Sequence, residues 1–538
     1  MSHDHRPDRR HFLQRAATMS AMGAALPFGL NMGALTQASA QSATGNYKAL
    51  VCLFFNGGND GFNTVLATDS TSWAHYLHHR RPTDGSTSIA LMEAGVAPVG
   101  TAAGSAPERL GGVLPINHAG RSVHAGRTFA LHPALTKLRD IHNAGRACVL
   151  ANVGPLTRPT TKLDYASTTA SKPAKLFSHN DQQSTWQSFQ PEGASEGWGG
   201  RMGDVLMSAN GAGRSASEAG IIRRLFTCMT PAQTSVWLAG REVLPYQSSN
   251  TGIQGLGSNG RIYGSTGLHS AVASVMGTVS SGGSTPADRA NLFMLDQRDL
   301  VQRALTASTL LGSQLAPLGV GPWSSTGVTN VGNDPLLKYT SPLDGAQKFN
   351  GVALQLQMIA RLIATNSTAN LGITRQFFMV NMGGFDTHDN QISEQADRMA
   401  VIDHALSYFD TVLASMPGGI DMRSQVTTFT ASEFGRTFTS NGDGTDHGWG
   451  SHHIVMGGAV NGTEVYGTFP QYSSANSAGS FSSPDQIENG SLIPTTSVDQ
   501  YAYTLGKWMG VSAGDLAALL PNLNQFNSGA HDLGFMRA

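Results

Sequence analysis

The chain has 538 residues, of which only 13% are charged, and a formal net charge of -1 at pH 7. No basic block follows the N-terminal segment, which argues against nucleic acid or an anionic membrane surface as a partner. The length is sufficient for one large α/β domain with insertions or for two domains.

The first forty residues have the pattern of an export signal. Arg9 and Arg10 are followed by an uncharged stretch from Ala16 to Ala40, which ends in the small-x-small cleavage site Ala-Ser-Ala. Its polar residues and glycines make this stretch too polar for a membrane span of about 20 residues. The sequence therefore predicts recognition by the twin-arginine export machinery and removal of residues 1–40. The mature protein is expected in the periplasm or secreted, without a stable membrane anchor.

The next part of the chain alternates strand-like and helix-like segments. Residues 48–55, KALVCLFF, predict a buried strand, and a second strand is expected at 147–153 after a helix that opens near residue 132. Between them, the histidines at 75, 78 and 79 beside Arg80 are interpreted as a polar helix face. The three cysteines form no Cys-x-x-Cys pair, and Cys52 and Cys148 lie in apolar runs, which favours buried inert thiols.

The alternation breaks down from roughly residue 190 to 340 and then returns. The Gly/Ser-rich composition of that range predicts an inserted cap, with a helix near 287–312. Beyond it, apolar spacing predicts a helix at 354–363, a strand at 375–382, a helix at 399–413, a strand at 426–430 and a helix near 501–509. Helices between strands predict a parallel sheet.

Acidic and histidine residues follow the strand-like runs. Asp60 comes after the first strand, Asp386 and His388 follow the strand at 375–382, and Glu433 follows the strand at 426–430. In an open α/β sheet, loops at the carboxyl ends of neighbouring strands meet in one crevice. Because carboxylates and imidazoles gathered in this way can bind a divalent metal, the sequence indicates a metal-assisted hydrolase.

Five ordered motifs resemble an exported bacterial family called "domain of unknown function 1501". They are FNGGNDG (55–61), LFSHNDQ (176–182), GGFDTH (383–388), SEFGRT (432–437) and TDHGWG (445–450). The resemblance runs from about residue 46 to the C-terminus. That family in turn resembles the alkaline phosphatase and sulfatase superfamily. The resemblance implies a mostly parallel central sheet flanked by helices over residues 41–538, with two divalent metals at its carboxyl edge.

The resemblance also assigns metal ligands. Asp60 is expected to bind one metal, although a turn Asp that caps its own backbone is an alternative. Asp386 and His388 are expected to share an ion, and Glu433 takes the place of an aspartate in the superfamily's Asp-His pair. Since the next residue, Phe434, cannot bind a metal, the expected substitute is His447, with His452 and His453 as competitors. Zinc is the first candidate metal, with manganese, calcium or magnesium as alternatives.

Three further residues are candidates for catalysis. Ser178 is a candidate nucleophile at the start of a helix, but it is equally suited to an N-cap that forms a capping box with Asp181. His179 is a candidate ligand, general acid or partner of Ser178. Arg436 is suited to bind an oxyanion, or alternatively to pair with Glu433. The expected activity is hydrolysis of a small-molecule phosphate or sulfate ester. The alternative is a degenerate, non-catalytic exported binding or assembly protein on the same fold.

Overall fold

The structure is a computed structural model that describes residues 47–81, 87–253, 262–263, 265–278, 301, 305–312, 314–476 and 479–537. The predicted export signal and much of the predicted helix at 287–312 lie outside the described residues.

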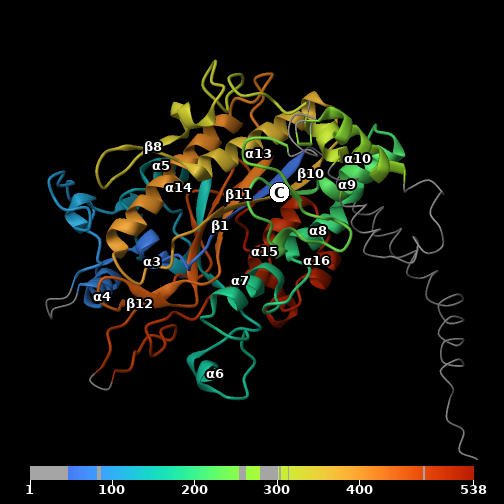
Figure 1. Cartoon of the computed structure of the whole chain (residues 1–538). Coiled ribbons are helices and arrows are strands. Elements are labelled where there is room, and N and C mark those ends of the chain that lie inside the picture. Colours follow the sequence, from blue (N-terminus) through green and yellow to red (C-terminus); the bar gives the residue numbers. More distant parts are fainter. Residues whose placement is uncertain are drawn as a thin grey trace, which may run out of the picture.

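A large, mostly parallel sheet forms the centre of the protein (Figure 1). Its middle strand, β1 (Lys48–Phe55), pairs in parallel with β10 (Arg375–Met382) on one side and with β11 (Val426–Ser432) on the other. The helix α14 (Gln391–Leu413) connects these two flanking strands in the sequence. The predicted strands at 48–55, 375–382 and 426–430 are therefore confirmed, as is their parallel pairing.

The sheet extends outward from both flanking strands. Beyond β10 lie β6 (Cys228–Thr230) and β7 (Tyr246–Gln247), both parallel to it. Beyond β11 lies the antiparallel β14 (Ser451–Met456), followed by β5 (Ala147–Gly154), which pairs with β15 (Val465–Tyr466) and β16 (Thr496–Ser497). Because β6 and β7 fall within 190–340, that range contributes an edge of the central sheet and is not solely an inserted cap.

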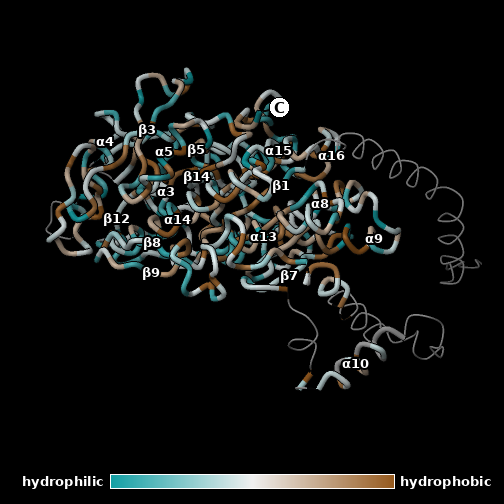
Figure 2. The backbone as a smooth tube through the Cα atoms, turned by 90° about the horizontal axis from the view of Figure 1, so that it is seen from above, coloured by the Kyte–Doolittle hydropathy of each residue, from teal (hydrophilic) through white to brown (hydrophobic). Residues whose placement is uncertain are grey.

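Helices cover both faces of this sheet. Alternate residues of β1 point to opposite faces: Val51 and Leu53 join one apolar cluster with α13 (Gly351–Thr368) and α14, whereas Leu50 and Cys52 join another with α8 (Trp198–Leu206) and α15 (Val498–Met509). Figure 2 shows α13 and α15 on opposite sides of β1. Burial on both faces explains why the sequence of β1 is apolar almost throughout.

Smaller elements surround the central layers. The remaining helices are α3 (Gly61–Thr64), α4 (Ser70–Arg80), α5 (Thr136–Asn143), α6 (Lys162–Ala166), α7 (His179–Ser188), α9 (Ala216–Leu225), α10 (Thr266–Thr278) and α16 (Ala513–Leu519). The small sheets are formed by β2 (Val65–Ala67), β4 (Phe129–Leu131) and β3 (Leu114–Ile116), by β12 (Arg436–Ser440) and β13 (Thr445–His447), and by β8 (Lys338–Thr340) and β9 (Gln347–Phe349). Among the described helices, none has the length and apolar character required to cross a bilayer.

Two side-chain predictions can be compared with this fold. All three cysteines are buried and unpaired, as expected for Cys52 and Cys148. The interpretation of α4 as a polar helix face is correct for His78, which is exposed, and for His75, which is half-buried. It is wrong for Arg80, which is fully buried, and for His79, which is nearly so. The buried guanidinium of Arg80 is matched by the carboxylate of Asp60, a partner that lies outside the helix and gives no signal in its spacing.

A buried carboxyl at the start of α15 gives the fold a pH-dependent stability. Burial raises the pKa of Asp499 from 3.8 to about 7, although its carboxylate accepts a hydrogen bond from the backbone nitrogen of Asn522. Between these two values the folded state holds a proton that the unfolded chain has released. The free energy of unfolding therefore decreases as the pH rises through this window.

Replacing Asp499 with asparagine is expected to remove this contribution. Urea unfolding of the wild type and Asp499→Asn at about pH 4 and about pH 7 measures it, and the variant should lose less stability between the two pH values. Equal losses in the two proteins would contradict the assignment to Asp499.

Candidate metal and catalytic site

Three loops meet at the carboxyl ends of β1, β10 and β11. The turn after β1 has positive φ angles at Gly57 (118°) and Gly58 (83°), a conformation that favours glycine. A Cβ atom at Gly57 would collide with the backbone nitrogen of Asp386, and one at Gly58 would collide with the ring of Phe434. The two glycines thus allow the loop after β1 to lie directly against the other two loops.

Three imidazoles surround the carboxylate of Asp386. The Nε2 atoms of His388 and His447 lie 3.1 and 3.2 Å from its Oδ1 atom, and Nε2 of His179 lies 3.5 Å from its Oδ2 atom. Within the described chain, His179, Asp386 and His447 form a group whose ligand atoms all lie within 4.8 Å of one another. His388 extends this group through its contacts with Asp386 and His447.

Each imidazole is oriented through its other nitrogen. Nδ1 of His447 lies 2.7 Å from the carbonyl oxygen of Phe177, and Nδ1 of His388 lies 3.3 Å from a carboxylate oxygen of Asp446. Because these oxygens only accept hydrogen bonds, the Nδ1 atoms must donate, and neutral rings therefore keep a lone pair on Nε2. The two Nε2 atoms are only 3.1 Å apart. Such an arrangement is repulsive unless a cation or a shared proton lies between the lone pairs.

Glu433 orients the third imidazole, that of His179. Its Oε1 atom accepts hydrogen bonds from the backbone nitrogen of Gly57 at 2.7 Å and from Nδ1 of His179 at 2.9 Å. Its Oε2 atom is buried and has no partner among the described residues. A buried carboxylate behind an imidazole is a common arrangement at metal sites, because it fixes the ring and increases its basicity.

The charges of the site influence one another. The hydrogen bond from His179 to Glu433 raises the pKa of His179, whereas burial lowers the pKa of His447. Although partial burial opposes it, the hydrogen bond and charge of Arg436 lower the pKa of Asp386. At neutral pH the site thus holds an ionised Asp386 and at least one imidazole available as a ligand. Protons and a metal ion would compete for these nitrogens.

Arg436 connects the three loops. Its guanidinium donates to Asp386 at 2.6 Å, to the carbonyl oxygen of Gly57 at 3.3 Å and to that of Thr445. The side chain has 0% exposure. Its observed role is therefore to position Asp386, and it forms no ion pair with Glu433. In this conformation it is not presented to a substrate oxyanion.

Phe434 forms a wall behind two of the imidazoles. The centre of its ring lies 4.8 Å from that of His179 and 4.7 Å from that of His447. The residue that departs from the superfamily pattern therefore packs against the site without contributing a ligand atom.

Asp60 is not brought into this cluster. Both of its carboxylate oxygens contact the guanidinium of Arg80, and they also accept hydrogen bonds from Gln391 and from the backbone nitrogen of Phe62. The contact with Phe62 is a backbone cap, which is the alternative role that the sequence predicts for Asp60. With its side chain buried and fully partnered, Asp60 has no free oxygen that faces the three imidazoles.

Ser178 also lies outside the cluster. It occupies the N-cap position of α7, but its hydroxyl donates to a carboxylate oxygen of Asp181 at 2.9 Å and makes no bond to the helix backbone. His452 and His453, the competitors of His447, are buried in β14, where Nδ1 of His452 accepts from the backbone nitrogen of Asn152.

The structure thus places six of the eight candidate residues in one cluster, and the other two lie outside that cluster. The residues in contact are His179, Asp386, His388, Glu433, Arg436 and His447, whereas Asp60 and Ser178 lie apart. Sequence reasoning missed Asp446, which orients His388 and directly precedes His447. Its position in the motif TDHGWG was the available signal.

The fold and the cluster define an α/β protein with imidazoles and carboxylates gathered at the carboxyl edge of a mostly parallel sheet. Residues 358–520 match the family model described as "Protein of unknown function (DUF1501)". This match, which includes β10, β11 and five of the six clustered residues, all except His179, supports the resemblance to that family. Comparisons with curated proteins and with solved structures found no match.

Proposed function

We propose that this protein is a metal-dependent hydrolase of phosphate or sulfate esters. The observation that supports the proposal is the convergence of three imidazole Nε2 atoms on the carboxylate of Asp386. In a tetrahedral zinc site, bonds of about 2.0–2.1 Å separate neighbouring ligand atoms by about 3.3 Å. The distances of 3.1 to 3.5 Å between the imidazole Nε2 atoms and the carboxylate oxygens of Asp386 are close to this value.

The residues present fit a divalent cation. His179, Asp386 and His447 would hold it, with His388 as a fourth ligand and Glu433 and Asp446 as the groups that orient the imidazoles. The mixture of nitrogen and oxygen donors favours zinc over magnesium or calcium, with manganese as an intermediate case. When bound, the metal would supply positive charge that polarises the ester and stabilises the charge that develops during hydrolysis.

The protein side chains supply the remaining chemistry. Glu433 fixes the ring of His179 and, by accepting the hydrogen bond from Nδ1, leaves Nε2 free to bind the metal, while Arg436 holds Asp386 in place. Because the hydroxyl of Ser178 is bonded to Asp181, a water molecule is the proposed nucleophile. The alkaline-phosphatase-like relationship is part of this proposal, and the position of the cluster at the carboxyl edge of the sheet supports it.

Hydrolysis tests the proposal directly. The mature protein, loaded with zinc or with manganese, is expected to cleave an activated phosphate or sulfate ester, and treatment with a chelator should abolish the activity. A metal-loaded protein that cleaves no ester of a broad panel would support the second candidate, a non-catalytic exported binding or assembly protein. The engagement of Asp60 with Arg80 and the burial of Arg436 favour that candidate.

Ser178→Ala distinguishes the two possible nucleophiles. Since the hydroxyl of Ser178 donates to Asp181 and makes no contact with the cluster, the variant should keep its metal and most of its hydrolytic rate, within about tenfold. Metal content and turnover are measured on the same preparation. A decrease of several orders of magnitude with the metal retained would assign the nucleophile to Ser178 instead.

We also propose that the protein is exported by the twin-arginine route. Changing Arg9 and Arg10 together to lysine is expected to leave the precursor in the cytoplasm, because the exporter recognises the paired arginines. Cell fractionation of the wild type and the double variant measures this, with Arg6→Lys as the matched control outside the pair. An unchanged yield outside the cytoplasm would contradict this route.

A further inference from the structure

One helix connects the cluster to a second feature of the surface. His179 is the first residue of α7. Further along the helix, Asn180, Gln183, Ser184 and Gln187 recur at the spacing i, i+3, i+4 and i+7, which places them on one face. A helix face that packs against the protein is normally apolar. This face is polar and lines a cavity.

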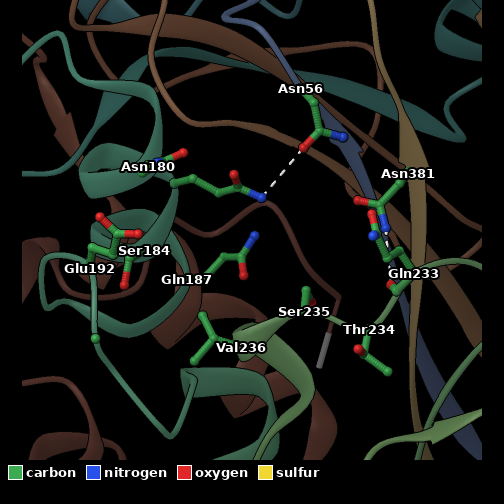
Figure 3. A pocket seen from close by; sticks show the side chains of 12 residues that line it. Asn56, Asn180, Ser184, Gln187, Glu192, Gln233, Thr234, Ser235, Val236 and Asn381 are labelled. Carbon is green, nitrogen blue, oxygen red and sulfur yellow. Dashed lines mark hydrogen bonds between the residues drawn. The ribbon is translucent and has the colours of Figure 1, made fainter.

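The cavity lies between α7, the end of β1 and the strand β10. Its volume is about 450 Å³, within the range of about 300–1,000 Å³ that is typical of small-molecule sites. The opposite wall is formed by Asn56, Asn381 and the segment 233–236, as Figure 3 shows. Asn56 directly precedes Gly57, and Asn180 directly follows His179, so the cavity and the cluster are neighbours at the same edge of the sheet.

The lining of the cavity has an unusual composition. Six side chains are carboxamides: Asn56, Asn180, Gln183, Gln187, Gln233 and Asn381. Three are hydroxyls and one is a carboxylate, and within the described part of the lining Val236 is the only apolar side chain. No lysine, arginine or histidine is among the described residues that line it, so these residues offer no counter-charge for an anionic group. With a single apolar side chain among the described lining residues, the cavity has no aliphatic or aromatic cluster that would hold an acyl chain or an aromatic ring.

A buried donor in this cavity lacks a partner. Gln187 is 1% exposed, and its Oε1 atom accepts a hydrogen bond from the backbone nitrogen of Trp237 at 3.2 Å. This bond fixes the orientation of the amide, because the reverse orientation would place two donors against each other. The Nε2 atom is buried without a partner among the described residues, as is the hydroxyl of Ser235. Figure 3 shows the amide of Gln187 directed into the space between α7 and the segment 233–236.

We propose that this cavity binds a neutral saccharide unit. A carboxamide offers a donor and an acceptor side by side, and neighbouring sugar hydroxyls, which also donate and accept, match this pattern. An acceptor oxygen of the sugar satisfies Nε2 of Gln187, which otherwise stays desolvated and unpaired. The site itself is independent of any reaction. That the bound sugar carries the phosphate or sulfate ester placed at His179 and Asp386 rests on the proposed function.

Binding measurements on the full mature protein test this inference. Neutral mono- and disaccharides are titrated against the wild type and followed by saturation-transfer NMR and calorimetry. Gln187→Leu, which keeps the shape of the side chain, and the half-exposed Gln183→Ala should each weaken binding of the same sugar at least about tenfold, the loss of one or two hydrogen bonds. Gln190→Ala, an exposed glutamine outside the lining, is the matched control and should bind as the wild type does.

The outcomes separate this inference from the proposed hydrolysis. Asp386→Asn should retain sugar binding, because Asp386 does not line the cavity. Sugar binding without hydrolysis in the wild type would overturn the proposed function and leave the saccharide site intact. Absence of binding across the panel, or binding that Gln187→Leu and Gln183→Ala leave unchanged, would overturn the saccharide site. So would preferential binding of blocked tripeptides that these variants weaken.

Discussion

Asp386→Asn is expected to remove the bound metal and to abolish ester hydrolysis. Asp386 is the one residue that all three imidazoles approach, and asparagine keeps its shape while removing the negative charge. The loss of a Lewis acid worth several kcal/mol corresponds to a decrease of about two to four orders of magnitude in the rate. Metal content by mass spectrometry and turnover of an activated ester are measured together.

A matched control lies on the same loop. Asp389→Asn makes the same chemical change at an exposed position for which the structure records no side-chain hydrogen bond, and it should leave metal content and turnover unchanged. Glu433→Gln, which alters only the group behind His179, should weaken metal binding by about 10- to 100-fold. Full metal occupancy in Asp386→Asn would contradict the assignment of this carboxylate as a ligand.

Asp60→Asn is expected to destabilise the fold without removing the metal. The substitution leaves the guanidinium of Arg80 buried without its counter-charge, which costs about 3–5 kcal/mol. Chemical denaturation measures the free energy of unfolding, and metal content is determined on the folded fraction. The double variant Asp60→Asn with Arg80→Met should be less destabilised than the sum of the two single variants, because the pair interacts directly.

The opposite result would restore the ligand role that the resemblance implied for Asp60. If Asp60→Asn unfolds at the same denaturant concentration as the wild type but loses its metal, the carboxylate acts on the metal and the ion pair with Arg80 is incidental. The two readouts therefore distinguish a structural from a metal-binding carboxylate at this position.

The sequence predicted the strands of the site better than the partners of its side chains. Apolar runs such as KALVCLFF identify β1, β10 and β11 because these strands are buried on both faces, and parallel pairing then places Asp386, Glu433 and their neighbours at one edge. The two-residue spacing of Asp386 and His388 predicted that they share an ion; their side chains lie 3.1 Å apart, and the shared ion stays a prediction.

The remaining contacts depend on partners that are distant in the chain. The sequence of α4 contains nothing to indicate that Arg80 turns inward, because its partner Asp60 lies 20 residues earlier and the pairing is a property of the packed core. The same holds for Arg436, which bonds to Asp386 and not to the nearer Glu433. Local sequence patterns assign residues to helices and strands. Which of several charged side chains forms an ion pair with an arginine depends on how these helices and strands pack together.

Anomalous diffraction at the zinc absorption edge, on crystals of the mature protein dialysed against zinc, tests most directly whether His179, Asp386 and His447 bind a metal. One strong peak is expected within about 2.0–2.2 Å of His179 Nε2, of a carboxylate oxygen of Asp386 and of His447 Nε2. Zinc-soaked crystals without a peak at these three atoms, or with the metal bound elsewhere in the protein, would contradict this assignment.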